Sequence, residues 1–339
     1  MSFTRPAGWF HTAAEVAAGH DLAGRQVVLT GATSGIGAET ARALAGTGAD
    51  IVLGVRRLDA GEALAAELGA AARGRIEARE LNLADLASVR RFADGVAGPV
   101  DVLIANAGVS KTPDAHLPNG LEVRFATNHL GHFALAHWLH GRMAVRGARI
   151  VVLSSAGHKG MPVRLDDLQW QAREHFDGAA YAESKSANIL FAQETTRRWA
   201  GDGICANAVL PGSALTGLQR HHGEALKRRI GFIHDDGAVD DWVKTAQQAA
   251  ATSVWAALAP ELAGRGGLVL EDCGEALPVG PETHPWAGFD AAVADPATAR
   301  ALWELSLGLV QAGRARSLSV SDKAATSTSS TVQPIMPKA

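Results

Sequence analysis

Tyrosine and cysteine are almost absent from this sequence. Its 339 residues include one tyrosine, Tyr181, and two cysteines, Cys205 and Cys273. Two cysteines cannot form a disulfide framework, and their spacing fits no metal-ligand motif. We therefore expect a reduced, cytoplasmic compartment and no bound metal. A protein that used tyrosine routinely for packing would contain several, so Tyr181 is a candidate for chemistry.

A strong charge of one sign and long apolar runs are also missing. The 32 lysines and arginines nearly balance the 35 aspartates and glutamates, and the net charge is −3. No basic block points to nucleic acid or to an anionic membrane surface. The apolar runs are far shorter than the ~18 residues of a membrane span, and the N-terminus lacks the apolar core of a signal peptide. We expect neither a nucleic-acid partner nor a membrane span.

Apolar runs typical of buried strands alternate with alanine-rich helical stretches. The expected strands are 26–30, 50–55, 75–81, 100–105, 148–154, 203–210 and 267–270. Nearly continuous apolar strands that alternate with helices predict a parallel sheet covered on both faces. The fold class is therefore α/β, a Rossmann-type doubly wound, mostly parallel seven-stranded sheet. Seven strands in one series make a single domain over residues 24–312.

The two ends of the chain differ from this pattern. Residues 1–23 form a lead-in, in which Thr12 and Glu15 are spaced as a capping box and predict a short helix over 12–18. Residues 313–339 become rich in Ser, Thr, Ala and Pro from Leu318 onward. Such a segment has too little apolar content to pack, so we expect a disordered tail.

A glycine-rich turn follows the first expected strand and precedes a helical stretch. It reads Thr-Gly-Ala-Thr-Ser-Gly-Ile-Gly over residues 30–37. Glycines allow the backbone to turn sharply and to approach a pyrophosphate, and the following helix N-terminus favours anions. The spacing differs from the commoner GxGxxG dinucleotide motif. The alternative is a tight turn without a ligand.

Arginines stand where the second expected strand ends. The segment reads Gly-Val-Arg56-Arg57, and no carboxylate lies between Ile51 and Leu58. In a dinucleotide fold an acid at this place binds the ribose 2′-hydroxyl of NAD, whereas an arginine accommodates the 2′-phosphate of NADP. The pattern favours NADP(H); the alternative is a pair of solvated surface arginines.

Tyr181 and Lys185 are four residues apart on an expected helix, so they share one face. A nearby ammonium should lower the pKa of the tyrosine and make it a usable acid or base. Ser154 and Ser155 end the strand 148–154, at the edge where open α/β sheets place their sites. Taken singly, these are also compatible with a chance pair and a turn-forming serine.

Taken together, these motifs resemble the short-chain dehydrogenase/reductase family over about residues 20–312. The match consists of the turn over 30–37, Asn106 to Gly108, Ser155 with Tyr181 and Lys185, and the Pro211-Gly212 pair. The segment 125–133 and the spacing between Ser155 and Tyr181 resemble the retinol-dehydrogenase-like branch, whose members mostly act on bulky apolar alcohols and carbonyls.

The resemblance implies a role for each matching residue. Tyr181 would donate the proton to the carbonyl oxygen or remove it from the alcohol, and Ser155, rather than Ser154, would polarise that oxygen. Lys185 would lower the pKa of Tyr181 and hold the nicotinamide ribose, and Asn128 would anchor a water behind it. The implied cofactor-binding residues are Gly31, Thr33, Ser34, Gly35, Ile36, Gly37, Arg56, Asn82, Leu83, Asn106, Gly108, Tyr181, Lys185, Pro211, Gly212 and Thr216. The family usually has Asp where Asn82 stands, and Asn can still accept through its carbonyl oxygen.

The resemblance also implies a lid and a reaction. The lid would be the unusually long connection over about residues 213–244, whose basic residues either face an anionic substrate group or are solvated. The expected function is an NADP(H)-dependent oxidoreductase that acts on a small-molecule carbonyl or alcohol. The alternatives are an NAD-dependent alcohol dehydrogenase, a non-catalytic NADP(H)-sensing regulator and a partner-binding scaffold. A homodimer or homotetramer through the helices containing Asn128 and Tyr181 is compatible with the family.

Overall fold

The computed structural model describes residues 5–143, 148–219, 222–281 and 283–327. Its main sheet has eight strands in the order β10-β9-β6-β5-β4-β1-β2-β3. The strands of this sheet are β1 Gln26–Thr30, β2 Asp50–Val55, β3 Ile76–Glu80, β4 Val102–Ala105, β5 Arg149–Leu153, β6 Cys205–Leu210, β9 Val269–Glu271 and β10 Gly274–Glu275. All pairings are parallel except that of β9 with β10. The α/β doubly wound fold is confirmed.

The main sheet has eight strands where seven were expected, because the chain reverses direction after β9 and forms β10. Asp272 and Cys273 both adopt positive φ, 50° and 54°, the backbone of a tight two-residue hairpin turn. This turn brings β10 antiparallel against β9. Such turns usually contain Asn-Gly or Asp-Gly, so Asp-Cys gave no sequence signal.

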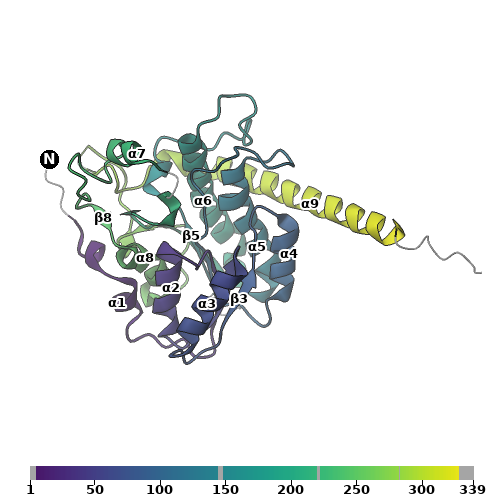
Figure 1. The fold of residues 1–339 in the computed structure, drawn as a ribbon, viewed down its shortest axis with the longest axis horizontal. Coiled ribbons are helices and arrows are strands. Elements are labelled where there is room, and N and C mark those ends of the chain that lie inside the picture. The colour runs from purple at the N-terminus through teal and green to yellow at the C-terminus, as the bar shows by residue number, and fades with distance from the viewer. Residues whose placement is uncertain (1–4, 144–147, 220–221, 282, 328–339) are drawn as a thin grey trace, which may run out of the picture.

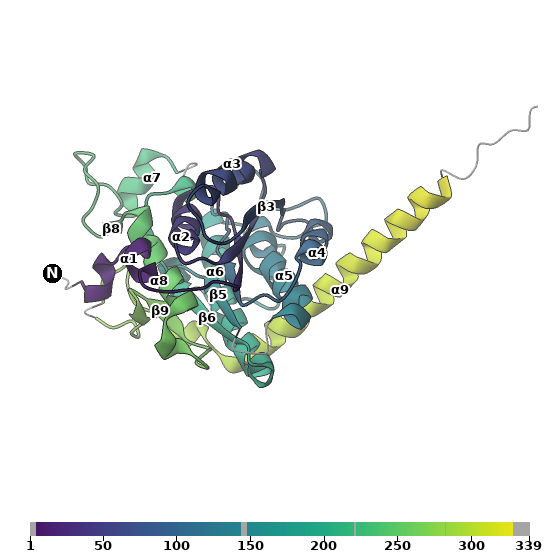
Figure 2. The same cartoon turned by 90° about the horizontal axis from the view of Figure 1, so that it is seen from below.

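Helices cover both faces of the sheet (Figures 1 and 2). One face carries α1 Ala13–Ala17, α2 Gly35–Ala45, α3 Leu58–Gly69 and α8 Ala246–Leu258. The other carries α4 Leu86–Gly95, α5 Gly131–Leu139, α6 Asp177–Trp199 and α9 Pro296–Ser327. Each face has its own apolar core, as both sides of a buried parallel sheet require. None of the described helices is both long and apolar enough to cross a membrane.

The two ends of the chain were predicted with different success. The helix α1 and its capping box between Thr12 and Glu15 are present as expected. At the other end, α9 runs through Ser327 and extends away from the body (Figure 2). The structure describes 313–327 as part of this helix, where the sequence predicted a disordered tail, and residues 328–339 lie outside the described part. No proline occurs between 297 and 327, so no missing backbone N–H interrupts the described helix after its first residue.

Candidate active site

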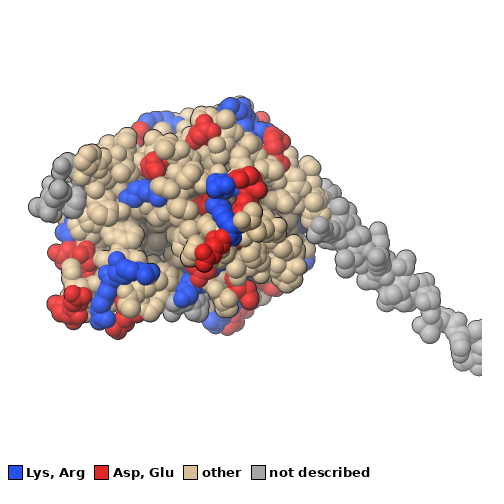
Figure 3. Space-filling view, turned by 90° about the horizontal axis from the view of Figure 1, so that it is seen from above, with Lys and Arg blue, Asp and Glu red and all other residues tan. Residues whose placement is uncertain are grey.

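The residues singled out in the sequence gather where the parallel strands end. Gly31 follows β1, Arg56 follows β2, Asn106 follows β4 and Ser155 lies two residues after β5. Because β4 and β1 are neighbours although they are not consecutive in the chain, this edge is a switch point of the kind that binds ligands in α/β sheets. The face crossed by α7 (Glu224–Arg229) is hollowed, with Lys and Arg side chains near the hollow (Figure 3).

The glycine positions of the turn over residues 30–37 have no space for a side chain. Gly31 and Gly35 have φ of 72° and 55°, a left-handed backbone that favours glycine. A Cβ on Gly37 would lie 2.2 Å from the carbonyl oxygen of Gly31. Thr33 and Ser34 are exposed at the tip, and no side chain caps the first turn of α2. The N–H groups there are free to meet an anion.

Asn106 holds this turn in shape. Its amide nitrogen donates to the carbonyl oxygens of Thr30 at 2.8 Å and Gly31 at 3.2 Å. The Thr30 hydroxyl accepts from the backbone of Asn106 at 3.0 Å and lies 2.8 Å from Nε2 of His132. Burial lowers the pKa of His132 to about 4, so this imidazole is a neutral member of the network. Asn106 thus shapes the turn from a neighbouring strand.

Three further predicted cofactor residues lie along the adjacent strand ends. Arg56 is exposed and has no ion pair with a described residue, whereas Arg57 pairs with Asp59 at 2.9 Å. Asn82 is half-buried, and its Oδ1 accepts from the backbone of Ala84 at 3.2 Å. Leu83 is buried.

Tyr181 and Lys185 lie on the first half of α6, beside the end of β5. Lys185 is buried, its Nζ donates to the carbonyl oxygen of Leu153 at 2.9 Å, and it lies 5.6 Å from the centre of the Tyr181 ring. The Ser154 hydroxyl donates to the Lys185 carbonyl at 2.7 Å. Ser155, by contrast, accepts from the backbone of Gly157 at 3.1 Å and is hydrogen-bonded to Tyr181. Ser155 is therefore the hydroxyl that faces the tyrosine.

Burial opposes the expected lowering of the Tyr181 pKa by Lys185. Desolvation raises the pKa of Tyr181, and the hydrogen bond with Ser155 only opposes this rise. Burial also lowers the pKa of Lys185 to about 8. Low polarity disfavours both charged forms, so the structure favours a protonated phenol beside an ammonium that is easily neutralised.

Asn128 joins the catalytic helix to the loop after β4. It lies in a π-helical turn, Phe125–Leu130, a feature found often at functional sites. Its Oδ1 accepts from the backbone of Val109 at 2.8 Å, and its Nδ2 donates to Ser184 at 2.9 Å. A Cβ on Gly108 would lie 3.3 Å from Asn128 and 3.5 Å from Lys185. These three residues therefore meet.

The segment after β6 lies across the glycine turn. Pro211 and Gly212 are followed by β7 Ser213–Ala214, which pairs with β8 Val243–Lys244, so the two ends of the expected lid are joined. Thr216 lies against Gly35, where a Cβ would be 3.0 Å away. Within this segment, α7 presents Lys227, Arg228 and Arg229, and Arg228 pairs with Glu224 at 3.1 Å.

Two buried residues that support the site were not found from the sequence. Arg124 is fully buried and bonds Glu122 at 2.8 Å, the Ser110 carbonyl at 2.7 Å, and Asp177 at the start of α6. His158 connects Ser155 to the C-terminal part of the chain. The charged residues Glu122 and Arg124, which alternate with apolar ones, were the available signal for Arg124; His158 had none.

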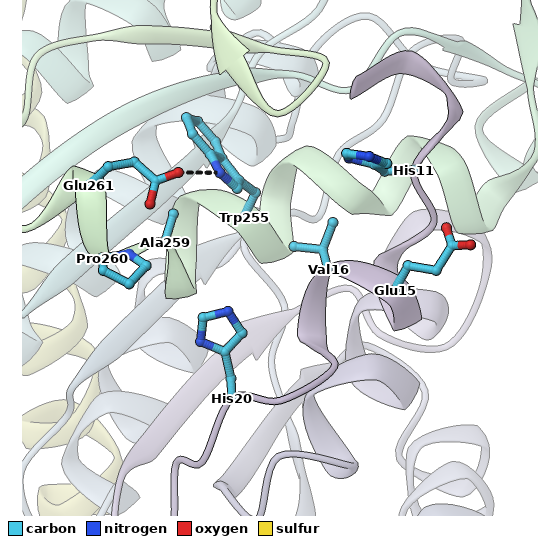
Figure 4. Close-up of a pocket in the computed structure, with 8 residues that line it drawn as sticks. All are labelled: His11, Glu15, Val16, His20, Trp255, Ala259, Pro260 and Glu261. Atoms are coloured by element: carbon cyan, nitrogen blue, oxygen red, sulfur yellow. Dashed lines mark hydrogen bonds between the residues drawn. The ribbon is translucent and has the colours of Figure 1, made fainter. Parts of the chain in front are cut away.

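A separate cavity of about 260 Å³ lies between α1 and α8 (Figure 4). It is lined by His11, Glu15, Val16, His20, Trp255, Ala259, Pro260 and Glu261. None of these residues belongs to the predicted site. We therefore place the candidate active site at the strand ends and not in this cavity.

Comparison with known proteins places this geometry in a family. The sequence profile of the short chain dehydrogenase family matches residues 25–227. A protein of Streptomyces lividans named "Probable oxidoreductase" is 45% identical, over 86% of this chain and 100% of that protein. Human retinol dehydrogenase 13 is 37% identical, over 85% of this chain and 85% of its own length.

Solved structures agree with these sequence matches. The crystal structure of an uncharacterised protein from Mycobacterium paratuberculosis has a TM-score of 0.66 and 36% identity, and the match covers 87% of this chain and 97% of that one. A short chain dehydrogenase from Burkholderia cenocepacia, in complex with NADP, has a TM-score of 0.60 and 25% identity, over 74% and 97% of the two chains. This chain is an oxidoreductase of the short-chain dehydrogenase/reductase family, with retinol-dehydrogenase-like relatives.

Proposed function

We propose that the protein is an NADP(H)-dependent oxidoreductase that interconverts a ketone or aldehyde and an alcohol on a medium to large, largely apolar substrate. The observation that carries this proposal is the meeting of Ser155, Tyr181 and Lys185 beside a glycine turn without room for side chains. The name of the relative retinol dehydrogenase 13 supports the apolar substrate class.

The residues present fit a nicotinamide dinucleotide. The close backbone at Gly31 and Gly37 and the uncapped start of α2 suit a pyrophosphate. Arg56, exposed and without an ion pair to a described residue, would take the 2′-phosphate, and the NADP complex of the Burkholderia relative supports this choice. When bound, the cofactor supplies or accepts the hydride.

The protein's own contribution is the proton and its surroundings. Because desolvation raises the pKa of Tyr181, its hydroxyl stays protonated and is ready to donate to a carbonyl oxygen during reduction. Ser155, hydrogen-bonded to the same hydroxyl, would polarise that oxygen. Lys185 and Asn128, which both lie near Gly108, would hold the cofactor's ribose and a proton-relay water.

Titration of the purified protein with NADPH and with NADH, followed by tryptophan fluorescence, tests this proposal. Carbonyl reduction is then measured on probes from acetaldehyde to all-trans-retinal. We expect NADPH to bind at least tenfold more tightly, about 1.4 kcal/mol, and turnover to rise with the apolar size of the probe. Tighter NADH would favour the NAD-dependent alcohol dehydrogenase, and cofactor binding without turnover would favour the regulator. If neither cofactor bound, the proposal would fail.

A further inference from the structure

His158 lies three residues after Ser155 and is bonded on both sides of its ring. It ends a short 3-10 helix, Ala156–His158, and is fully buried. Its Nδ1 is 2.6 Å from the carbonyl oxygen of Ser155, and its Nε2 is 3.0 Å from the backbone nitrogen of Asp290. The imidazole therefore spans two segments that are far apart in the sequence.

These partners determine where the proton of the ring lies. A carbonyl oxygen can only accept a hydrogen bond, and a backbone N–H can only donate one. Nδ1 must therefore carry the hydrogen, and Nε2 must be bare. Burial lowers the pKa of His158, which agrees with this neutral tautomer. The ring is a fixed donor toward Ser155 and a fixed acceptor toward Asp290.

The segment that His158 reaches, residues 284–290, is here called the wall segment. Lys159 Nζ donates to the carbonyl oxygens of Pro285 at 2.5 Å and Ala287 at 2.8 Å. The backbone nitrogen of Gly160 donates to the Asp290 carboxylate at 2.9 Å. Three successive residues, from 158 to 160, thus attach the wall segment to the loop that contains Ser155.

The wall segment also contacts the lid. The ring of Trp286 lies 5.3 Å from that of Phe232, and His284 stacks on Trp242 with ring centres 3.8 Å apart. The wall segment therefore stands between the serine loop and the expected substrate lid, and a shift at His158 would be passed on to both.

We propose that His158 is a positioning residue, which sets the place of Ser155 through one ring nitrogen and that of the wall segment through the other. The proposal rests on the proposed function. It assigns the hydrogen bond from Nδ1 to Ser155 to the chemical step, and the hydrogen bond of Nε2 with Asp290 in the wall segment to substrate binding.

Two substitutions separate the two bonds. The side-chain amide of His158→Asn can take the place of Nδ1 and keep the bond to Ser155, but it does not reach Asp290. The longer side chain of His158→Gln can take the place of Nε2 and accept from Asp290, but it leaves the Ser155 carbonyl without its donor. The measurements are hydrogen exchange of peptides covering 284–290, and kcat and KM for NADPH-dependent reduction of 4-nitrobenzaldehyde.

We expect opposite results for the two variants. His158→Asn should speed exchange in the wall segment about fivefold to tenfold and raise KM by a similar factor, with kcat within twofold. His158→Gln should leave exchange near that of the unchanged protein and lower kcat about tenfold. His140→Asn, which removes a partly exposed histidine that pairs with Asp202, is the matched control and should change neither.

Equal behaviour of the two variants in exchange and kinetics would overturn the proposal. So would unchanged exchange in His158→Ala, which loses both bonds. If the unchanged protein reduced no carbonyl and bound no NADPH, the proposed function would fail, while the exchange measurement would still decide whether His158 holds the wall segment. Circular dichroism of each variant confirms that it folds.

Discussion

The glycine turn and the first half of the catalytic helix lie at the same edge of the sheet but are built in opposite ways. At the turn, Thr33, Ser34 and Arg56 are exposed, and no side chain caps α2. Around α6, Lys185 and Asn128 are buried, and each donates to a protein carbonyl oxygen. The turn is therefore open and leaves its donors for a ligand, whereas the catalytic side encloses Lys185 and Asn128 and leaves Ser155 and Tyr181 half-buried. Cofactor affinity should depend on the first region and proton chemistry on the second.

The largest expected effect comes from removing the one tyrosine hydroxyl. Tyr181→Phe should lower kcat by about 10²–10⁴, because this is the contribution of a positioned acid or base. Binding of NADPH should stay within a few-fold, since the ring and the glycine turn are unchanged. Steady-state kinetics and fluorescence titration measure the two quantities. Normal turnover would remove Tyr181 as the acid, and a parallel loss of NADPH binding would break the separation of the two regions.

A smaller effect is expected on stability from the buried lysine. The pKa of Lys185 is about 8 in the folded protein, against 10.5 ordinarily, so the buried ammonium destabilises the fold at neutral pH. As the pH rises from 8 to 10.5, the folded protein loses this proton before the unfolded chain does, and the penalty disappears. The quantity to compare is the unfolding free energy of Lys185→Met minus that of the unchanged protein. This difference should be about 3 kcal/mol larger below pH 8 than above pH 10.5.

Urea unfolding at pH 7, 9 and 10.5 measures this difference. Lys111→Met is the control, because Lys111 is exposed and has no burial penalty to relieve. A difference that stayed constant with pH would mean that the lysine is not desolvated, and the catalytic region would then be as open as the glycine turn.

The same contrast explains what the sequence could predict. The glycine turn, the ends of β1 and β2 and the capping box of α1 depend on rules that act over a few residues. The strand β10 and the full length of α9 were not predicted. Tight hairpin turns usually contain Asn-Gly or Asp-Gly rather than Asp-Cys, and Ser-rich segments are usually disordered rather than helical. The raised pKa of Tyr181 was missed because burial is a property of the folded chain.

The candidate site shows this limit residue by residue. The resemblance alone favoured Ser155 over Ser154 in the sequence. In the structure Ser154 donates to the Lys185 carbonyl, whereas Ser155 faces Tyr181. Arg124 acts through Glu122 beside it and through Asp177, 53 positions away, and His158 through Asp290, 132 positions away. Partners at such separations leave no local pattern, so the supports of the catalytic side required the structure.

The smallest effect expected is at the open side, and a neighbouring residue supplies its control. Arg56→Ala should weaken NADPH binding about tenfold and leave NADH binding unchanged, because only NADPH has the 2′-phosphate. Arg56 is exposed and has no ion pair to a described residue that would compete for its guanidinium. Arg57→Ala should change neither affinity, because Arg57 is already paired with Asp59. Fluorescence titration of both variants with both cofactors gives four affinities. Equal losses for NADPH and NADH, or a larger loss in Arg57→Ala, would assign the phosphate to a different donor while leaving the open glycine turn as the cofactor's place.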